Sequence, residues 1–139
     1  MLTKDQYKFL KALLKASKQY KKDNTVAKFQ NRECVDLKGL EALLIKYPKI
    51  NAGNPYKISE NDSLNLPFLI QYIEIYLKQA GLEDCVDYFA PDKYSVSNTG
   101  KSKIEEYKNH LIKKWSSILT LVISIIAIVI SIIALAIKA

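Results

Sequence analysis

Few side chains in this sequence have a type and spacing that would support catalysis. The only histidine, His110, stands just before a long apolar segment, which favours an interfacial polar role over that of a base in a folded pocket. Cys34 and Cys85 are far apart and form no CxxC or Cys/His metal-binding pattern. The adjacent Glu105 and Glu106 would point to different faces of a helix. Since glycine-rich phosphate loops and nucleophile elbows are also absent, we expect a non-enzymatic protein without catalytic residues, metal or cofactor.

Lysine supplies most of the charge, and it is unevenly distributed. The net charge is +7, yet residues 51–100 carry three basic and seven acidic groups. Six lysines near the N-terminus recur at alternating steps of four and three, which places them within about 80° of one another on a helix. This lysine stripe is a candidate binding site for an anionic surface, either a lipid leaflet or nucleic acid, although a solvated outer face is the simpler interpretation. Its members are Lys4, Lys8, Lys11, Lys15, Lys18 and Lys22.

The C-terminal segment from Ser116 to Ile137 contains no charge and no proline. At about 1.5 Å per residue, one helix of this length crosses a hydrocarbon core of ~30 Å, so we expect a single transmembrane helix over residues 115–138. Lys113, Lys114 and Trp115 precede the charge-free segment as membrane-interface anchors, whereas only Lys138 and Ala139 follow that segment. The positive-inside rule therefore predicts a single-pass protein of the cell membrane with a cytoplasmic N-terminus. A buried core helix of a soluble protein is the alternative.

Small side chains recur along this apolar segment at spacings of three and four, which places them on one seam of a helix. Such a seam lets two helices approach closely, and its hydroxyl groups can form hydrogen bonds between helices. It predicts self-association or docking on a partner span; the alternative is that serine and alanine are merely tolerated in an anchor of low complexity. The members of this small-residue seam are Ser117, Thr120, Ser124, Ala127, Ser131 and Ala134.

The chain before the apolar segment has room for one small domain, and its pattern is mainly α with a small β-hairpin. Capping and helix-stop residues predict helices that begin at Thr3, at Asp36 and at Ser97, and a further helix that ends at Gly81. The stretch 25–34 is ambiguous and is expected to be extended or irregular. Residues 85–89 and 93–96 are expected to form the hairpin. The expected divisions are a soluble domain over 1–97, a basic juxtamembrane helix over 98–114 and the transmembrane helix.

One part of this pattern resembles a known family. Residues 78–82 read Lys-Gln-Ala-Gly-Leu, a hairpin that ends in Tyr-Ser-Val-Ser follows, and Gly100 and Ile104 lie in the next helix. This resembles the winged-helix domain, over about residues 66–107. The resemblance implies that Ser97 is the helix cap, that residues 66–80 form the recognition helix, that residues 90–93 form the wing tip, and that the setting is a small bacterial tail-anchored protein.

The residues on the implied recognition helix depart from those of a DNA reader. Its exposed positions are expected to be Gln71, Glu74, Lys78 and Gln79, and only one of these is basic. The acidic residues that follow, such as Asp87, would repel phosphate. The leading hypothesis is therefore a membrane-anchored interaction module that faces the cytoplasm and binds the membrane and a protein partner. A membrane-tethered nucleic-acid-binding regulator and a small oligomerising membrane-active protein are the alternatives.

Overall fold

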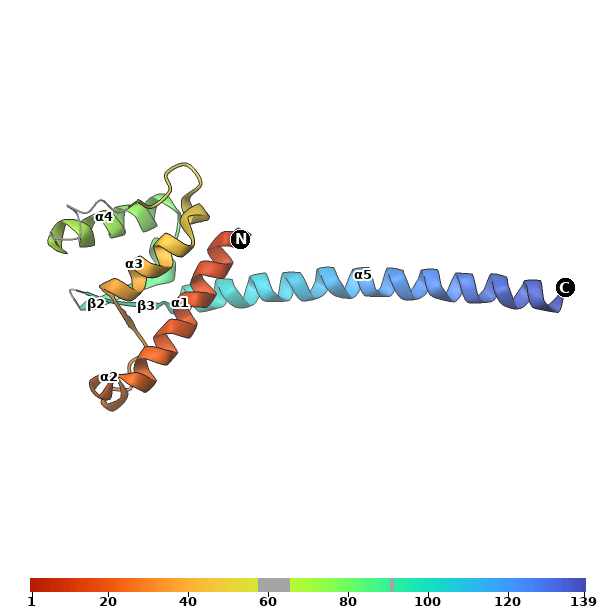
Figure 1. The fold of residues 1–139 in the computed structure, drawn as a ribbon, viewed down its shortest axis with the longest axis horizontal. Helices are drawn as coiled ribbons and strands as arrows, with labels where there is room; N and C mark the ends of the chain where they lie inside the picture. Colours follow the sequence, from red (N-terminus) through yellow and green to blue (C-terminus); the bar gives the residue numbers. More distant parts are fainter. Residues whose placement is uncertain (58–65, 91) are drawn as a thin grey trace. The chain divides into compact units, whose positions relative to one another are not determined.

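The computed structural model describes residues 1–57, 66–90 and 92–139, and within these ranges the chain is mainly helical with one small antiparallel sheet (Figure 1). Contacts divide the chain into two compact units, Met1–Glu105 and Glu106–Ala139. The first unit contains the sheet and nearly all of the buried side chains, whereas the second consists of helix alone.

The first helix, α1, spans Lys4–Asp23 and begins as its sequence predicts. The Gln6 backbone N–H donates to Thr3 Oγ1 at 3.2 Å, and the Thr3 N–H donates to Gln6 Oε1 at 3.1 Å. This reciprocal pair satisfies two donors that a helix N-terminus otherwise leaves unpaired. One face of α1 is buried, with Phe9, Leu10 and Leu13 fully enclosed in the core.

The stretch after α1 corrects the expectation of an extended or irregular segment, because it begins with the short helix α2, Thr25–Phe29. Asn24 causes this local order, since its Oδ1 accepts from the Ala27 N–H at 3.0 Å and caps the new helix. The helix ends at Phe29, and Asn31 then has a positive φ of 54°, outside the helical region.

The sheet contains the predicted hairpin and one further strand, which makes three strands among the described residues. Strand β1, Val35–Asp36, pairs antiparallel with β3, Lys93–Val96, which also pairs with β2, Val86–Ala90. The strand order is β1-β3-β2, with Val35 opposite Tyr94. The hairpin of β2 and β3 follows the sequence prediction, whereas β1 is too short to show a periodic pattern.

Helix α3, Leu37–Lys46, begins at the expected cap, where the Gly39 N–H donates to Asp36 Oδ1 at 2.8 Å. Leu37, Leu40 and Leu44 are buried, whereas Leu43 is half-buried. The short 3₁₀ helix η1, Pro48–Asn51, follows.

Helix α4, Leu66–Gln79, ends before Gly81, whose φ of +74° is the left-handed conformation that glycine adopts without a Cβ penalty. The 3₁₀ helix η3, Glu83–Cys85, then leads into β2. Ile73, Tyr76 and Leu77 supply much of the buried face of α4. They complete the core of the first unit.

The last helix, α5, runs without interruption over Asn98–Lys138. The Gly100 N–H donates to Ser97 Oγ at 3.0 Å, and the Ser97 hydroxyl donates in turn to the Asp84 carbonyl, so the predicted cap at Ser97 is confirmed. Gly100 and Ile104 are buried within the first unit. The beginning of α5 is therefore part of the fold that contains the sheet.

Candidate functional site

The lysine stripe is an exposed row of unpaired charges on α1. All six of its lysines are exposed. No ion pair joins any of them to another residue in the part of the chain that the structure describes. Lys11 places its ammonium group 5.7 Å from the centre of the Tyr7 ring. None of the other five stripe lysines has its ammonium group over an aromatic ring of a described residue. Because no described carboxylate neutralises them, these lysines are available to an anionic surface.

Helix α5 is the one helix of the described chain that is long and apolar enough to cross a membrane. None of its apolar stretch is buried against other parts of the protein. The flanking Lys113 and Lys114 are exposed, and Trp115 is 66% exposed. A run of exposed aliphatic side chains of this length is unfavourable in water, because each Å² of apolar surface left exposed forgoes about 25 cal/mol of stabilisation. The same run is stable in the hydrocarbon core of a membrane.

Along the small-residue seam, three hydroxyl groups are already satisfied within the helix. Thr120 Oγ1 donates to the Ser116 carbonyl, Ser124 Oγ to the Thr120 carbonyl and Ser131 Oγ to the Ala127 carbonyl, each at 2.9 Å. These serines and the threonine therefore do not need a partner helix to satisfy their donors in lipid. Close approach of a second helix over Ala127 and its neighbours stays a prediction.

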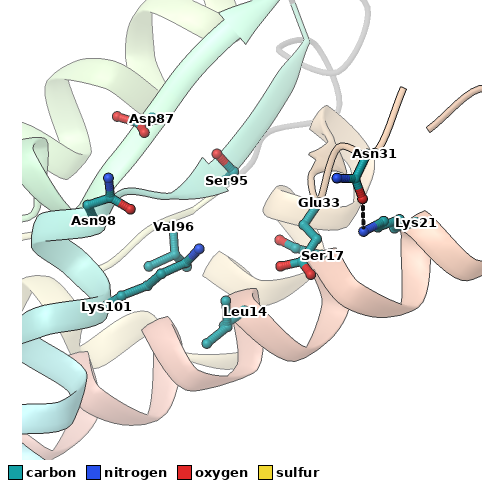
Figure 2. Close-up of a pocket in the computed structure, with 10 residues that line it drawn as sticks. All are labelled: Leu14, Ser17, Lys21, Asn31, Glu33, Asp87, Ser95, Val96, Asn98 and Lys101. Carbon is teal, nitrogen blue, oxygen red and sulfur yellow. Dashed lines mark hydrogen bonds between the residues drawn. The ribbon is translucent and has the colours of Figure 1, made fainter. Parts of the chain in front are cut away.

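A polar hollow of about 370 Å³ lies in the first unit, where residues far apart in sequence come together (Figure 2). Figure 2 shows the Lys21 ammonium joined by a hydrogen bond to Asn31 Oδ1 near one end, and Asn98 and Lys101 near the other. The lining carries both signs of charge, so the hollow is better suited to a zwitterionic group or ordered water than to a strong anion. Polar residues that line it include Ser17, Lys21, Glu33, Asp87, Asn98 and Lys101.

The polar hollow offers little for nucleophilic chemistry. Its buried hydroxyl, Ser17 Oγ, donates to the Leu13 carbonyl at 2.8 Å rather than to a base. Burial raises the pKa of the Cys34 and Cys85 thiols, which disfavours the reactive thiolate. Within the described ranges, no three His, Cys, Asp or Glu side chains are grouped so as to hold a metal ion.

The outer face of α4 presents the side chains that its sequence predicts. Gln71, Glu74, Lys78 and Gln79 are all exposed, and Ile75, which the sequence analysis did not single out, is 55% exposed. A face with one base, one acid and an aliphatic residue is poorly suited to phosphate and base edges.

Sequence reasoning did not find the polar hollow. Its walls come from α1, from the segment after α2, from the hairpin and from the beginning of α5, so no local sequence motif predicts it. Comparison with protein-family profiles, curated proteins and solved structures found no match for this chain. The function is therefore argued from the chemistry of these surfaces.

Proposed function

We propose that this protein is a non-enzymatic interaction module that α5 holds at the cytoplasmic face of the cell membrane. The observation that carries the proposal is a folded unit, Met1–Glu105, that continues into a helix whose exposed aliphatic stretch is long enough to cross a bilayer. The lysines before the stretch and the single lysine after it support a cytoplasmic N-terminus.

The order of elements supports a winged-helix domain as the module. Helix α1, strand β1, helices α3 and α4, and the β2–β3 hairpin follow one another, and the sheet order β1-β3-β2 brings the first strand beside the last. The cap at Ser97 and the buried Gly100 and Ile104 lie where the family pattern has its own cap, glycine and aliphatic residue. This fold serves many functions, so the surfaces and not the fold identify the partners.

The module presents two surfaces of opposite charge. The lysine stripe faces the anionic leaflet, where each lysine close to the surface contributes about 1 kcal/mol of attraction. The exposed face of α4, with the acidic residues of η3 and β2, faces a protein partner. A second candidate function is nucleic-acid binding, which the unpaired lysines of the stripe favour, since a phosphate backbone attracts the same charges.

The test uses the full chain in lipid nanodiscs. A spin-labelled lipid headgroup is expected to broaden the amide NMR signals of α1 in anionic discs much more than in neutral discs. Replacing four stripe lysines with glutamine (K8Q/K11Q/K15Q/K18Q) is expected to remove this difference. The matched control replaces four exposed lysines outside the stripe (K28Q/K38Q/K49Q/K57Q) and is expected to keep it.

The same discs separate the two candidate functions. In neutral discs, random duplex DNA that binds tightly at low salt, weakens steeply toward physiological salt and depends on the stripe would favour nucleic-acid binding. Equal broadening of α1 signals in the anionic and neutral discs, with no binding to DNA, would refute both roles for the stripe.

A further inference from the structure

A second, smaller hollow lies between α4 and the hairpin, on the acidic side of the module. Its volume is about 190 Å³, smaller than the ~300–1,000 Å³ of a typical metabolite pocket, so it suits one side chain rather than a whole metabolite. We call it the acidic hollow. It is lined by Glu74, Leu77, Glu83, Val86, Tyr88 and Tyr94.

The charged groups of the acidic hollow have one sign. Glu74 and Glu83 are exposed, and neither forms an ion pair with a residue in the described ranges. No basic residue lines the hollow among the described residues. Two carboxylates without a counter-charge, at the rim of a partly enclosed site, favour a cation.

The walls add two aromatic faces. Tyr88 and Tyr94 are opposite one another in the β2–β3 register, and their ring centres are 5.4 Å apart. Tyr88 is 46% exposed, so part of its side chain is accessible from solvent. An ammonium or guanidinium group within about 6 Å of such a ring is attracted to its electron-rich face.

The unsatisfied hydroxyl group of Tyr94 also favours a ligand that donates a hydrogen bond, as an ammonium or guanidinium group does. Tyr94 is only 1% exposed, and its buried hydroxyl has no hydrogen-bond partner among the described residues. A buried hydroxyl without a partner costs about 1–3 kcal/mol, which a bound donor would recover. Burial, with the nearby Tyr88 and Glu74, raises the pKa of this phenol, so it stays neutral and can accept an N–H at physiological pH.

We propose that the acidic hollow binds the side chain of a lysine or arginine from a protein partner. The carboxylates of Glu74 and Glu83 accept from the cation, the Tyr88 ring lies against it, and the Tyr94 oxygen accepts a further N–H. The proposal rests on the interaction module proposed above and names the chemistry of its partner.

The test titrates the full chain, isotope-labelled and held in neutral nanodiscs, with a peptide containing three consecutive lysines. Amide shifts are expected to concentrate at Glu74, Glu83 and Tyr88, and a peptide with norleucine in place of each lysine is expected to cause none. E74Q/E83Q is expected to weaken binding about fivefold, since each exposed ion pair contributes roughly 0.5 kcal/mol. The matched control E105Q/E106Q removes the same charge from two exposed carboxylates elsewhere and is expected to bind as the wild type does.

Tyr94→Phe adds a readout that a purely structural role would not give. It is expected to weaken lysine binding at least twofold while making the unliganded fold at least as stable as before, because the hydroxyl it removes is buried and has no described partner. Shifts that spread over the whole surface, or an equal loss in E105Q/E106Q, would overturn the proposal. Binding of spermidine as tight as that of the peptide would overturn the protein partner and indicate that the ligand is a free polyamine. Failure to enter the nanodisc would instead refute the anchor, so the two failures are distinguishable.

Discussion

Gly100 is the glycine at which an added Cβ is expected to destabilise the fold most. An alanine Cβ built there lies 2.4 Å from the Cys85 carbonyl oxygen and 2.8 Å from Val96 Cγ1. Real Cβ contacts essentially never fall below 3.0 Å, so the backbone must separate by about 0.6 Å. The same Cys85 oxygen accepts the Ser97 N–H at 2.9 Å, so the movement also lengthens the hydrogen bond that ties the beginning of α5 to η3.

Two opposing terms set the magnitude of Gly100→Ala. Overpacking a close contact costs about 1–3 kcal/mol, and it falls toward the upper part of that range here because the obstacle is backbone. Alanine recovers at most ~1 kcal/mol of helix propensity. The net loss in the free energy of unfolding is therefore about 1–2 kcal/mol, which at roughly 4–8 °C per kcal/mol for a unit of this size lowers Tm by ~4–16 °C.

The assay is thermal unfolding of the full chain in detergent micelles, followed by near-UV circular dichroism of the buried tyrosines. Gly53→Ala is the matched control, because nothing lies within 4 Å of the Cβ built there, and its Tm is expected to stay at or slightly above the wild-type value. A Gly100→Ala protein as stable as the Gly53→Ala control would refute the close approach of α5 to Cys85.

Three further predictions concern caps and a buried phenol. Thr3→Ala removes one half of the capping box and is expected to cost ~1 kcal/mol in urea unfolding. Ser97→Ala leaves the Asp84 carbonyl without its donor and the Gly100 N–H without its acceptor, so a larger loss of about 2 kcal/mol is expected in the same assay. Burial raises the pKa of Tyr94, so the fold favours its neutral form; stability is fully present below the unfolded pKa of ~10 and declines as pH rises above it. Tyr94→Phe is expected to flatten that decline in stability measured against pH, and an unchanged alkaline slope would contradict the burial of the phenol.

The parts of the fold that are predictable from sequence are those that a short stretch of chain determines by itself. Thr3 and Gln6 satisfy each other's backbone donors three residues apart, and Asp36 caps α3 in the same way. Gly81 is identifiable because a helix stop needs a residue that tolerates positive φ. The charge-free run in α5 needs only length and composition.

The features that the sequence analysis missed depend on partners that are distant along the chain or on very short segments. Strand β1 has two residues, Val35–Asp36, and is a strand only because β3, nearly sixty positions later, pairs with it. Helix α2 depends on one side chain, Asn24, which serves as both the end of one helix and the cap of the next. The two hollows combine three or more elements, so the separate positions carry no signature.

The separation of charge within one small unit also explains why the winged-helix hypothesis and the doubt about DNA are compatible. A phosphate backbone that approached α4 would meet Glu74 and the acidic residues of η3 and β2, with Lys78 alone in its favour. Repulsion of that kind acts within the ~8 Å Debye length of physiological salt, so it is strongest for a phosphate that lies directly against α4 and its acidic neighbours. Binding through α1 would place the nucleic acid or lipid on a different element and leave α4 and the hairpin to a basic partner. One fold would then engage two surfaces of opposite charge at once, which a membrane-tethered adaptor needs and a reader of DNA sequence does not.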